Sequence, residues 1–139
     1  MNRLTRMIPV IAIVCVAGLA ACNDEDPFDE DADRARLDKM EAEIDELIGE
    51  ANCKDFQECR SIAFGDKPCG GPWKYKIFSK ASVDSVRLAD MVRDYNKFNV
   101  TLNRRYGWMS DCMVVVQPGT DCLDGRCVAV EPAGEQALE

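Results

Sequence analysis

The chain has 139 residues, with 17 basic and 25 acidic side chains, eight cysteines and no histidine. The lack of histidine removes the usual general base at neutral pH and the commonest metal ligand. The acidic balance and the lack of a basic stripe argue against binding to nucleic acid or to an anionic membrane surface.

The N-terminal segment has the layout of an export signal. Two arginines precede an apolar run over residues 7–21, which ends in small residues. This run is shorter than the about 20 apolar residues that a transmembrane helix needs. Leu19-Ala20-Ala21-Cys22 resembles the lipobox that signal peptidase II reads in bacterial lipoproteins. The resemblance implies that residues 1–21 are removed and that Cys22 carries a lipid. The alternative is an ordinary signal cut after Ala20 or Ala21.

The lipobox resemblance also implies a location in the cell envelope. It places the protein on the periplasmic or extracellular face of a membrane, anchored through the lipid on Cys22. By analogy with lipoprotein sorting, Asn23 after the cysteine favours the outer membrane.

The acidic side chains gather near the start of the exported chain. Residues 24–50 hold 13 acids and 3 bases, whereas residues 51–139 hold 12 of each. We interpret residues 22–30 as a self-repelling acidic tether, in which Pro27 blocks regular structure. The net acidity is therefore expected to belong to the tether and not to the folded domain.

Residues 31–51 are predicted to form an amphipathic helix. Its apolar side chains recur at three- and four-residue spacing: Leu37, Met40, Ile44, Leu47, Ile48 and Ala51. A stripe of this length most often packs on its own domain, but a two-heptad coiled coil between copies of the chain is the alternative. A short helix alone is marginal in water, so some partner is required.

Six cysteines lie beyond the signal and the lipobox, and they predict a disulfide framework. They are Cys53, Cys59, Cys69, Cys112, Cys122 and Cys127. An even number in a short exported domain is typical of disulfides. The spacings lack the paired C-x2-C motifs of zinc ribbons, so we expect neither a metal nor another cofactor. Six cysteines allow fifteen pairings, and the sequence selects none of them.

The segment 53–130 is expected to fold as one small domain, followed by a disordered tail over residues 131–139. Short strands are predicted over residues 60–64 and 75–78, and a buried strand over residues 113–116. A long helix is predicted to begin at Ser82 as N-cap and to stop at Gly107. Its apolar stripe has a clean helical period: Leu88, Met91, Val92, Tyr95, Phe98, Leu102 and Tyr106.

Residues 122–127 are predicted to form a tight hairpin, because Asp124-Gly125 suits a type I′ turn. The turn places Cys122 opposite Cys127. A bridge between these two is geometrically open, as is a bridge from each of them to the segment that holds Cys53 and Cys59.

These elements predict an α+β fold: a small disulfide-rich domain with one long helix packed on a short antiparallel sheet, preceded by an amphipathic helix. The cysteine-rich part resembles small secreted or lipoprotein domains of bacteria over residues 53–130. Cys69-Gly70-Gly71-Pro72 is its most distinctive piece. This resemblance implies no activity.

The loop over residues 67–75 is the best candidate for a recognition site. Two prolines and a bridge at Cys69 would fix its shape, which lowers the entropy cost of binding. Trp73, beside Lys74 and Tyr75, has the composition of an interface anchor. The alternative is that Trp73 fills the core, as we expect of Trp108.

The leading functional hypothesis is a cell-envelope binding module for a protein or a glycan, inhibitors included. One alternative is a structural or assembly lipoprotein that oligomerises through residues 31–51. Another is a carboxylate-dependent hydrolase that uses Asp66 or Asp111 with shifted pKa values. The sequence has no Ser/His/Asp set, phosphate loop or metal-ligand cluster, so we predict no enzyme and no catalytic residue. It does not indicate an oligomeric state.

Overall fold

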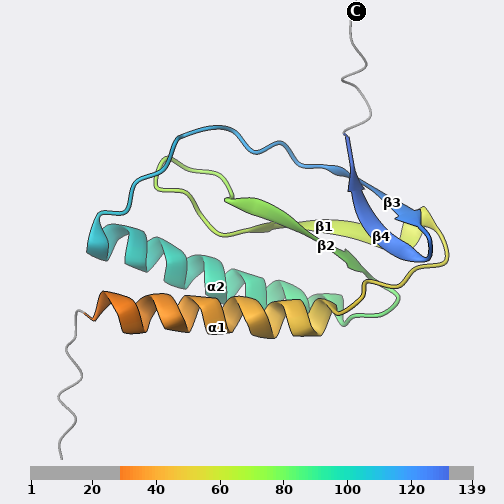
Figure 1. Cartoon of the computed structure of the whole chain (residues 1–139), viewed down its shortest axis with the longest axis horizontal. Helices are drawn as coiled ribbons and strands as arrows, with labels where there is room; N and C mark the ends of the chain where they lie inside the picture. The colour runs from red at the N-terminus through yellow and green to blue at the C-terminus, as the bar shows by residue number, and fades with distance from the viewer. Residues whose placement is uncertain (1–28, 132–139) are drawn as a thin grey trace, which may run out of the picture.

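A computed structural model describes residues 29–131, in which two helices lie against one β-hairpin and a second β-hairpin packs at the end of the first (Figure 1). The predicted signal, Cys22, residues 22–28 of the tether and residues 132–139 of the tail lie outside the described residues. In chain order the elements are α1 (Glu30–Ile48), η1 (Phe56–Glu58), β1 (Cys59–Phe64), β2 (Lys74–Ser79), α2 (Ser85–Tyr106), β3 (Gly119–Leu123) and β4 (Arg126–Val130).

The strands form two separate antiparallel hairpins, β1–β2 and β3–β4. The β1–β2 hairpin lies along the helices, and β3–β4 packs at its far end (Figure 1). Asp124 and Gly125 have φ values of 51° and 76°, which confirms the two left-handed residues of the type I′ turn. The expected small α+β, disulfide-rich fold is confirmed.

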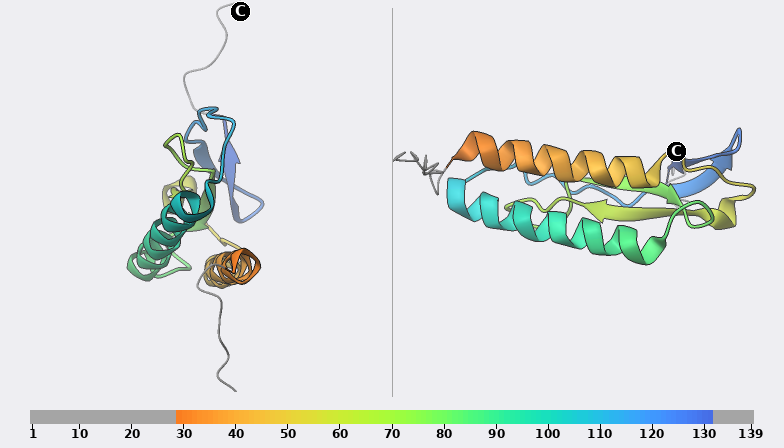
Figure 2. Two further views of the ribbon diagram at one scale, coloured as in Figure 1. Left: turned by 90° about the vertical axis from the view of Figure 1, so that its left-hand side faces the viewer. Right: turned by 90° about the horizontal axis from the view of Figure 1, so that it is seen from below.

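The two helices run antiparallel and side by side beneath β1–β2 (Figure 2). Asp29 caps α1, since its carboxylate accepts a hydrogen bond from the Ala32 N–H at 3.0 Å. The predicted N-cap of the long helix is wrong by two residues, because the carboxylate of Asp84 accepts two backbone N–H bonds at the start of α2. Gly107 ends α2 in the left-handed conformation, as predicted.

The core lies between the helix layer and β1–β2. Its buried members come from α1, both strands of the hairpin, the turn before α2, and α2: Leu37, Ile44, Phe64, Phe78, Val83, Leu88, Val92, Tyr95 and Leu102. Leu37 and Ile44 are only 6% and 1% exposed, so the stripe of α1 packs on its own domain. Burial of each such side chain contributes about 1.5–3 kcal/mol.

Three disulfides join segments that are distant in sequence. Cys53–Cys122 and Cys59–Cys127 attach the β3–β4 hairpin to the chain around β1, and Cys69–Cys112 attaches the loop before β2 to the segment after α2. The alternative bridge between Cys122 and Cys127 is therefore not formed. The sulfur atoms of Cys53, Cys59 and Cys127 lie within 4.8 Å of one another, but each is bound in a disulfide.

The predicted buried strand over residues 113–116 is wrong. Met113, Val114 and Val116 are 68%, 87% and 61% exposed, and the segment pairs with no strand in the described part of the chain. The space between the helices and β1–β2 is already filled by the core side chains. The segment therefore crosses the opposite side of the hairpin as an extended connection to β3 (Figure 1).

The assignment of the acidic side chains to the tether is also wrong in part. Glu41 and Asp45 of α1 bind lysines of β2, and Asp33 binds Arg105 of α2. These carboxylates belong to the folded domain, where they neutralise the basic side chains of the hairpin and of α2.

Candidate functional site

Three asparagines of α2 hold the base of the loop that connects β1 to β2. Asn96 and Asn99 accept hydrogen bonds from the backbone N–H groups of Gly65 and Asp66, each at 2.8 Å. Asn103 donates to the Asp66 carbonyl at 2.7 Å. Because residues 96, 99 and 103 share one face of a helix, a single surface of α2 fixes the path of the chain as it leaves β1.

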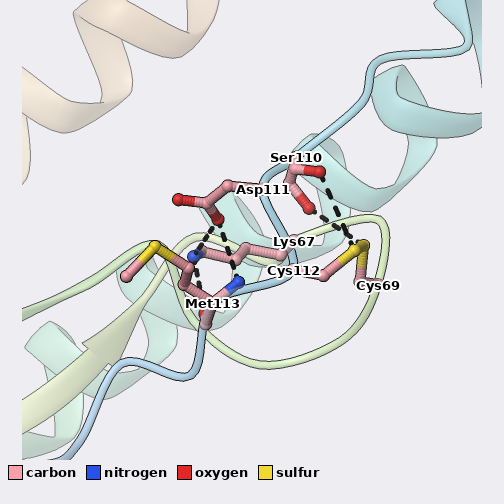
Figure 3. A network of polar contacts seen from close by, with 6 residues as sticks. All are labelled: Lys67, Cys69, Ser110, Asp111, Cys112 and Met113. Atoms are coloured by element: carbon pink, nitrogen blue, oxygen red, sulfur yellow. Dashed lines mark hydrogen bonds and ion pairs between the residues drawn. A yellow bond between two sulfur atoms is a disulfide. The ribbon is translucent and has the colours of Figure 1, made fainter.

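Lys67 fixes the middle of the same loop (Figure 3). Its side chain is 5% exposed and its ammonium donates to Asp111 Oδ1 at 2.9 Å and to the Met113 carbonyl at 2.8 Å. The hydrogen bond from Lys67 lowers the pKa of the exposed Asp111 carboxyl, so this acid is ionised at neutral pH. The Cys69–Cys112 bridge joins the same two segments beside it.

The rigid loop brings Trp73 to one side of a pocket that also contains the second tryptophan. We call this cavity of about 300 Å³ the tryptophan pocket, and its lining residues are Arg34, Leu37, Asp38, Trp73, Tyr95, Asn99 and Trp108. Both tryptophans of the sequence therefore face one cavity. Its volume lies at the lower end of the range of about 300–1,000 Å³ for small-molecule sites.

Trp73 lines the pocket while remaining partly exposed, which is intermediate between the two alternatives that the sequence left open. Its side chain is 39% exposed, so it is neither a core residue nor a free anchor. The ring packs on the backbone of Gly65, where a Cβ atom would lie 2.5 Å from Trp73 Cδ1. Gly65 has φ +75° and is held by Asn96. The position of the ring thus depends on the asparagines of α2.

Trp108 also lines the pocket and is half-buried against the core, in line with its expected packing. Its indole N–H donates to Glu30 Oε1 at 2.8 Å, and the Arg34 guanidinium lies 4.1 Å from the ring centroid. The hydrogen bond from Trp108, followed by that from Arg34, lowers the pKa of Glu30. This contact ties the start of α1 to the end of α2.

Tyr95 is a buried member of the pocket lining, stacked on Phe64 with ring centroids 4.1 Å apart. Burial, followed by the charges of Glu41 and Asp38, raises the pKa of Tyr95 to about 12. Tyr95 is therefore a neutral phenol at physiological pH and can donate a hydrogen bond. Arg34 and Asp38 add a cation and an anion from adjacent turns of α1.

The other predicted loop residues do not face the pocket. Lys74 donates to Glu41 at 2.5 Å, and Lys76 donates to Glu41 and Asp45. Tyr75 is half-buried on β2, opposite Ala63 of β1. The lysines that flank Trp73 in sequence are thus paired within the domain and stabilise the contact between β2 and α1.

Sequence reasoning missed the contribution of the helices to this site. Arg34 and Asp38 come from a helix that was interpreted only through its apolar stripe. The asparagines of α2 gave a usable signal, since three of them at positions 96, 99 and 103 are unusual in a helix interior. Their spacing predicts a polar line on one face, adjacent to the apolar stripe.

Asp66 and Asp111, the carboxylates of the hydrolase alternative, have separate environments. Asp111 is bound by Lys67, whereas Asp66 lines a groove between β1 and α2. Comparison with protein-family models, with curated proteins and with solved structures finds no match to this chain. In the described part of the chain, no helix has the length and apolar character needed to cross a membrane.

Proposed function

We propose that this chain is an exported, lipid-anchored protein of the cell envelope whose domain binds a glycan in the tryptophan pocket. The lipobox supports the anchor on Cys22, and Asn23 supports the outer membrane. The pocket supports the ligand class. The observation that carries the proposal is that Trp73, Trp108 and Tyr95 line one small cavity together with charged and amide side chains.

The chemistry of this lining suits a sugar ring. A pyranose has apolar C–H faces that pack on aromatic rings, and hydroxyl groups around its edge that need hydrogen-bond partners. Trp73 offers a partly exposed aromatic surface, while Arg34, which lies over the Trp108 ring, and Asp38 offer a donor and an acceptor. The loop and α1 are already fixed by internal contacts, so little conformational entropy is lost on binding.

The chain offers a direct assay, because both of its tryptophans line the pocket. The full-length protein in lipid nanodiscs is titrated with a panel of soluble oligosaccharides, neutral, acidic and N-acetylated, while tryptophan fluorescence is recorded. We expect a saturable change with at least one class of sugar. Trp73→Ala should abolish it and leave the thermal unfolding midpoint within a few degrees of wild type.

Asp38→Ala provides a second variant that leaves the core untouched. Asp38 is an exposed residue of α1, and so is Glu46, which does not line the pocket. We expect Asp38→Ala to weaken sugar binding and the matched Glu46→Ala to have no effect. A panel without any saturable fluorescence change, or binding that survives Trp73→Ala, would refute the proposed glycan site.

A further inference from the structure

A second concave surface lies between the outer edge of β1 and α2. This groove of about 580 Å³ shares no residue with the tryptophan pocket. Ile62 and Ala63 form its strand wall, and Asp66 also lines it. Its helix wall consists of Ala89, Val92, Arg93, Asn96, Lys97, Val100 and Thr101.

The groove is apolar because its neutral polar side chains are already paired within the domain. Asn96 accepts from the Gly65 N–H at 2.8 Å and donates to the Ala63 carbonyl at 3.4 Å. The hydroxyl of Thr101 donates to the Lys97 carbonyl at 3.0 Å. What remains toward the groove is the aliphatic surface of the valines, the alanines and Ile62, which favours an apolar occupant.

The register of β1 shows which of its backbone groups face the groove. The Lys80 N–H donates to the Glu58 carbonyl at the start of the ladder. In this register the backbone groups of the even-numbered residues of β1 bond β2, and those of the odd-numbered residues point away from β2. The outward carbonyls of Cys59 and Ala63 accept from Thr120 and Asn96. The N–H and C=O of Ser61 and the N–H of Ala63 have no partner among the described residues.

A strand edge with unpaired groups beside an apolar groove selects a particular kind of occupant. Main-chain hydrogen bonds to Ser61 and Ala63 require another extended backbone, as in β-strand addition. Side chains at alternate positions of that backbone would point into the groove.

The charged side chains of the groove indicate a further property of its occupant. Arg93 binds Asp90 at 2.8 Å, whereas the ammonium of Lys97 on the helix wall and the carboxylate of Asp66 have no ion pair within residues 29–131. An acidic side chain on the occupant would give Lys97 a partner.

We propose that the groove between β1 and α2 is a docking site for an extended polypeptide segment of a partner protein. The segment adds to β1 through Ser61 and Ala63, places apolar side chains between Ile62 and Val100, and offers a carboxylate to Lys97. This site is separate from the proposed glycan site, and either can exist without the other.

The test begins with a library of random 12-residue peptides displayed on phage, selected against the full-length protein in nanodiscs. The same library is counter-selected on Ala89→Glu, which places a charge in the groove at an exposed helix position. The matched control is Ala42→Glu, which adds the same charge at an exposed position of α1 outside the groove. Selected peptides are then synthesised for hydrogen-exchange measurements by NMR.

We expect the enriched peptides to have apolar residues at alternate positions with an acidic residue among them. They should bind wild type and Ala42→Glu equally and bind Ala89→Glu at least about tenfold more weakly. Binding should slow amide exchange at Ser61 and Ala63, and a proline at the central position of the peptide should abolish it. The proposal would be overturned if the selection gave no peptides that bind wild type more tightly than the Ala89→Glu variant. It would also be overturned if the selected peptides bound without slowing exchange of the Ser61 and Ala63 amides.

Discussion

Removal of a single disulfide at the β3–β4 hairpin should cost less than its sequence separation implies. Cys59 and Cys127 are 68 residues apart, and a loop of that length would give about 4.4 kcal/mol in the chain-entropy model. The neighbouring bridge shortens the loop, because Cys53–Cys122 joins positions six residues before Cys59 and five before Cys127. The loop that Cys59–Cys127 closes in the unfolded chain then has about 12 residues, worth about 3 kcal/mol.

The same reasoning applies to Cys53–Cys122 when Cys59–Cys127 is intact. We therefore expect each paired Cys→Ala variant to lose about 3 kcal/mol. Removal of both bridges should lose about 6.5 kcal/mol, because the second bridge, left without the first, closes a loop of about 26 residues through Cys69–Cys112 that is worth about 3.5 kcal/mol. Such a loss is as large as the whole stability of many small domains. The measurement is urea unfolding of the full-length protein without reductant, compared at constant m-value.

The Cys69–Cys112 bridge is the control, because both of its cysteines are exposed and their removal leaves no buried cavity. Its shortest loop runs through Cys59–Cys127 and has about 25 residues, worth about 3.5 kcal/mol. The reasoning would be refuted if removal of one hairpin bridge lowered the unfolding free energy by more than about 4 kcal/mol while removal of Cys69–Cys112 lowered it by about 3.5 kcal/mol. That result would show that the two hairpin bridges do not share a loop.

Three further changes test the positioning of Trp73 and the contact between α1 and β2. Gly65→Ala should lower the free energy of unfolding by about 1–3 kcal/mol and shift the fluorescence emission of Trp73, because the new Cβ would lie 2.5 Å from that ring. The control is Gly70→Ala, which is also at positive φ but has open space around it and should leave the emission unchanged. Asn99→Ala should cost about 1–3 kcal/mol in urea unfolding, because it leaves the part-buried backbone N–H of Asp66 unpaired. Burial alone would raise the pKa of Glu41, but hydrogen bonds from Lys74 and Lys76 outweigh it and hold that pKa below its usual value. Glu41 therefore stabilises the fold above about pH 4.5 and loses this effect as pH falls through its folded-state pKa. In a series of urea unfolding measurements at decreasing pH, the difference in unfolding free energy between wild type and Glu41→Gln should shrink.

The parts of this fold that follow from local rules could be predicted from the sequence. The stripe of α2, the Asp124-Gly125 turn and the Gly107 stop each depend on a few neighbouring residues, and the structure contains all of them. The stripe of α1 is present as far as Ile48, but the predicted end at residue 51 is wrong, because Gly49 caps the helix and Ala51 packs on Cys59 and Cys127 instead. The N-cap at Asp84 was missed because Ser82 is an equally good capping residue by type. Only the tertiary position of the chain decides between them.

The parts that depend on long-range contacts could not be predicted. Residues 113–116 have the apolar character of a buried strand. Burial would need room between the helices and β1–β2, and the core side chains already fill that layer. The disulfide pairing needed the position of the β3–β4 hairpin relative to β1. The tryptophan pocket joins residues of α1, the loop and α2, and no local pattern relates Trp73 to Trp108 or to Arg34.

The contact between the start of α1 and the end of α2 has a mechanical consequence. Glu30 binds Trp108, and Asp33 binds both Arg105 and Tyr106, within the first turn of α1. A pull on the chain at Asp29, as a membrane anchor would exert, is borne first by these contacts. The tryptophan pocket takes Arg34 and Asp38 from the next turns of the same helix. A tension between an anchored tether and a ligand in that pocket would thus pass along a short stretch of α1 and, through Trp73, into the loop before β2 that the Cys69–Cys112 bridge holds.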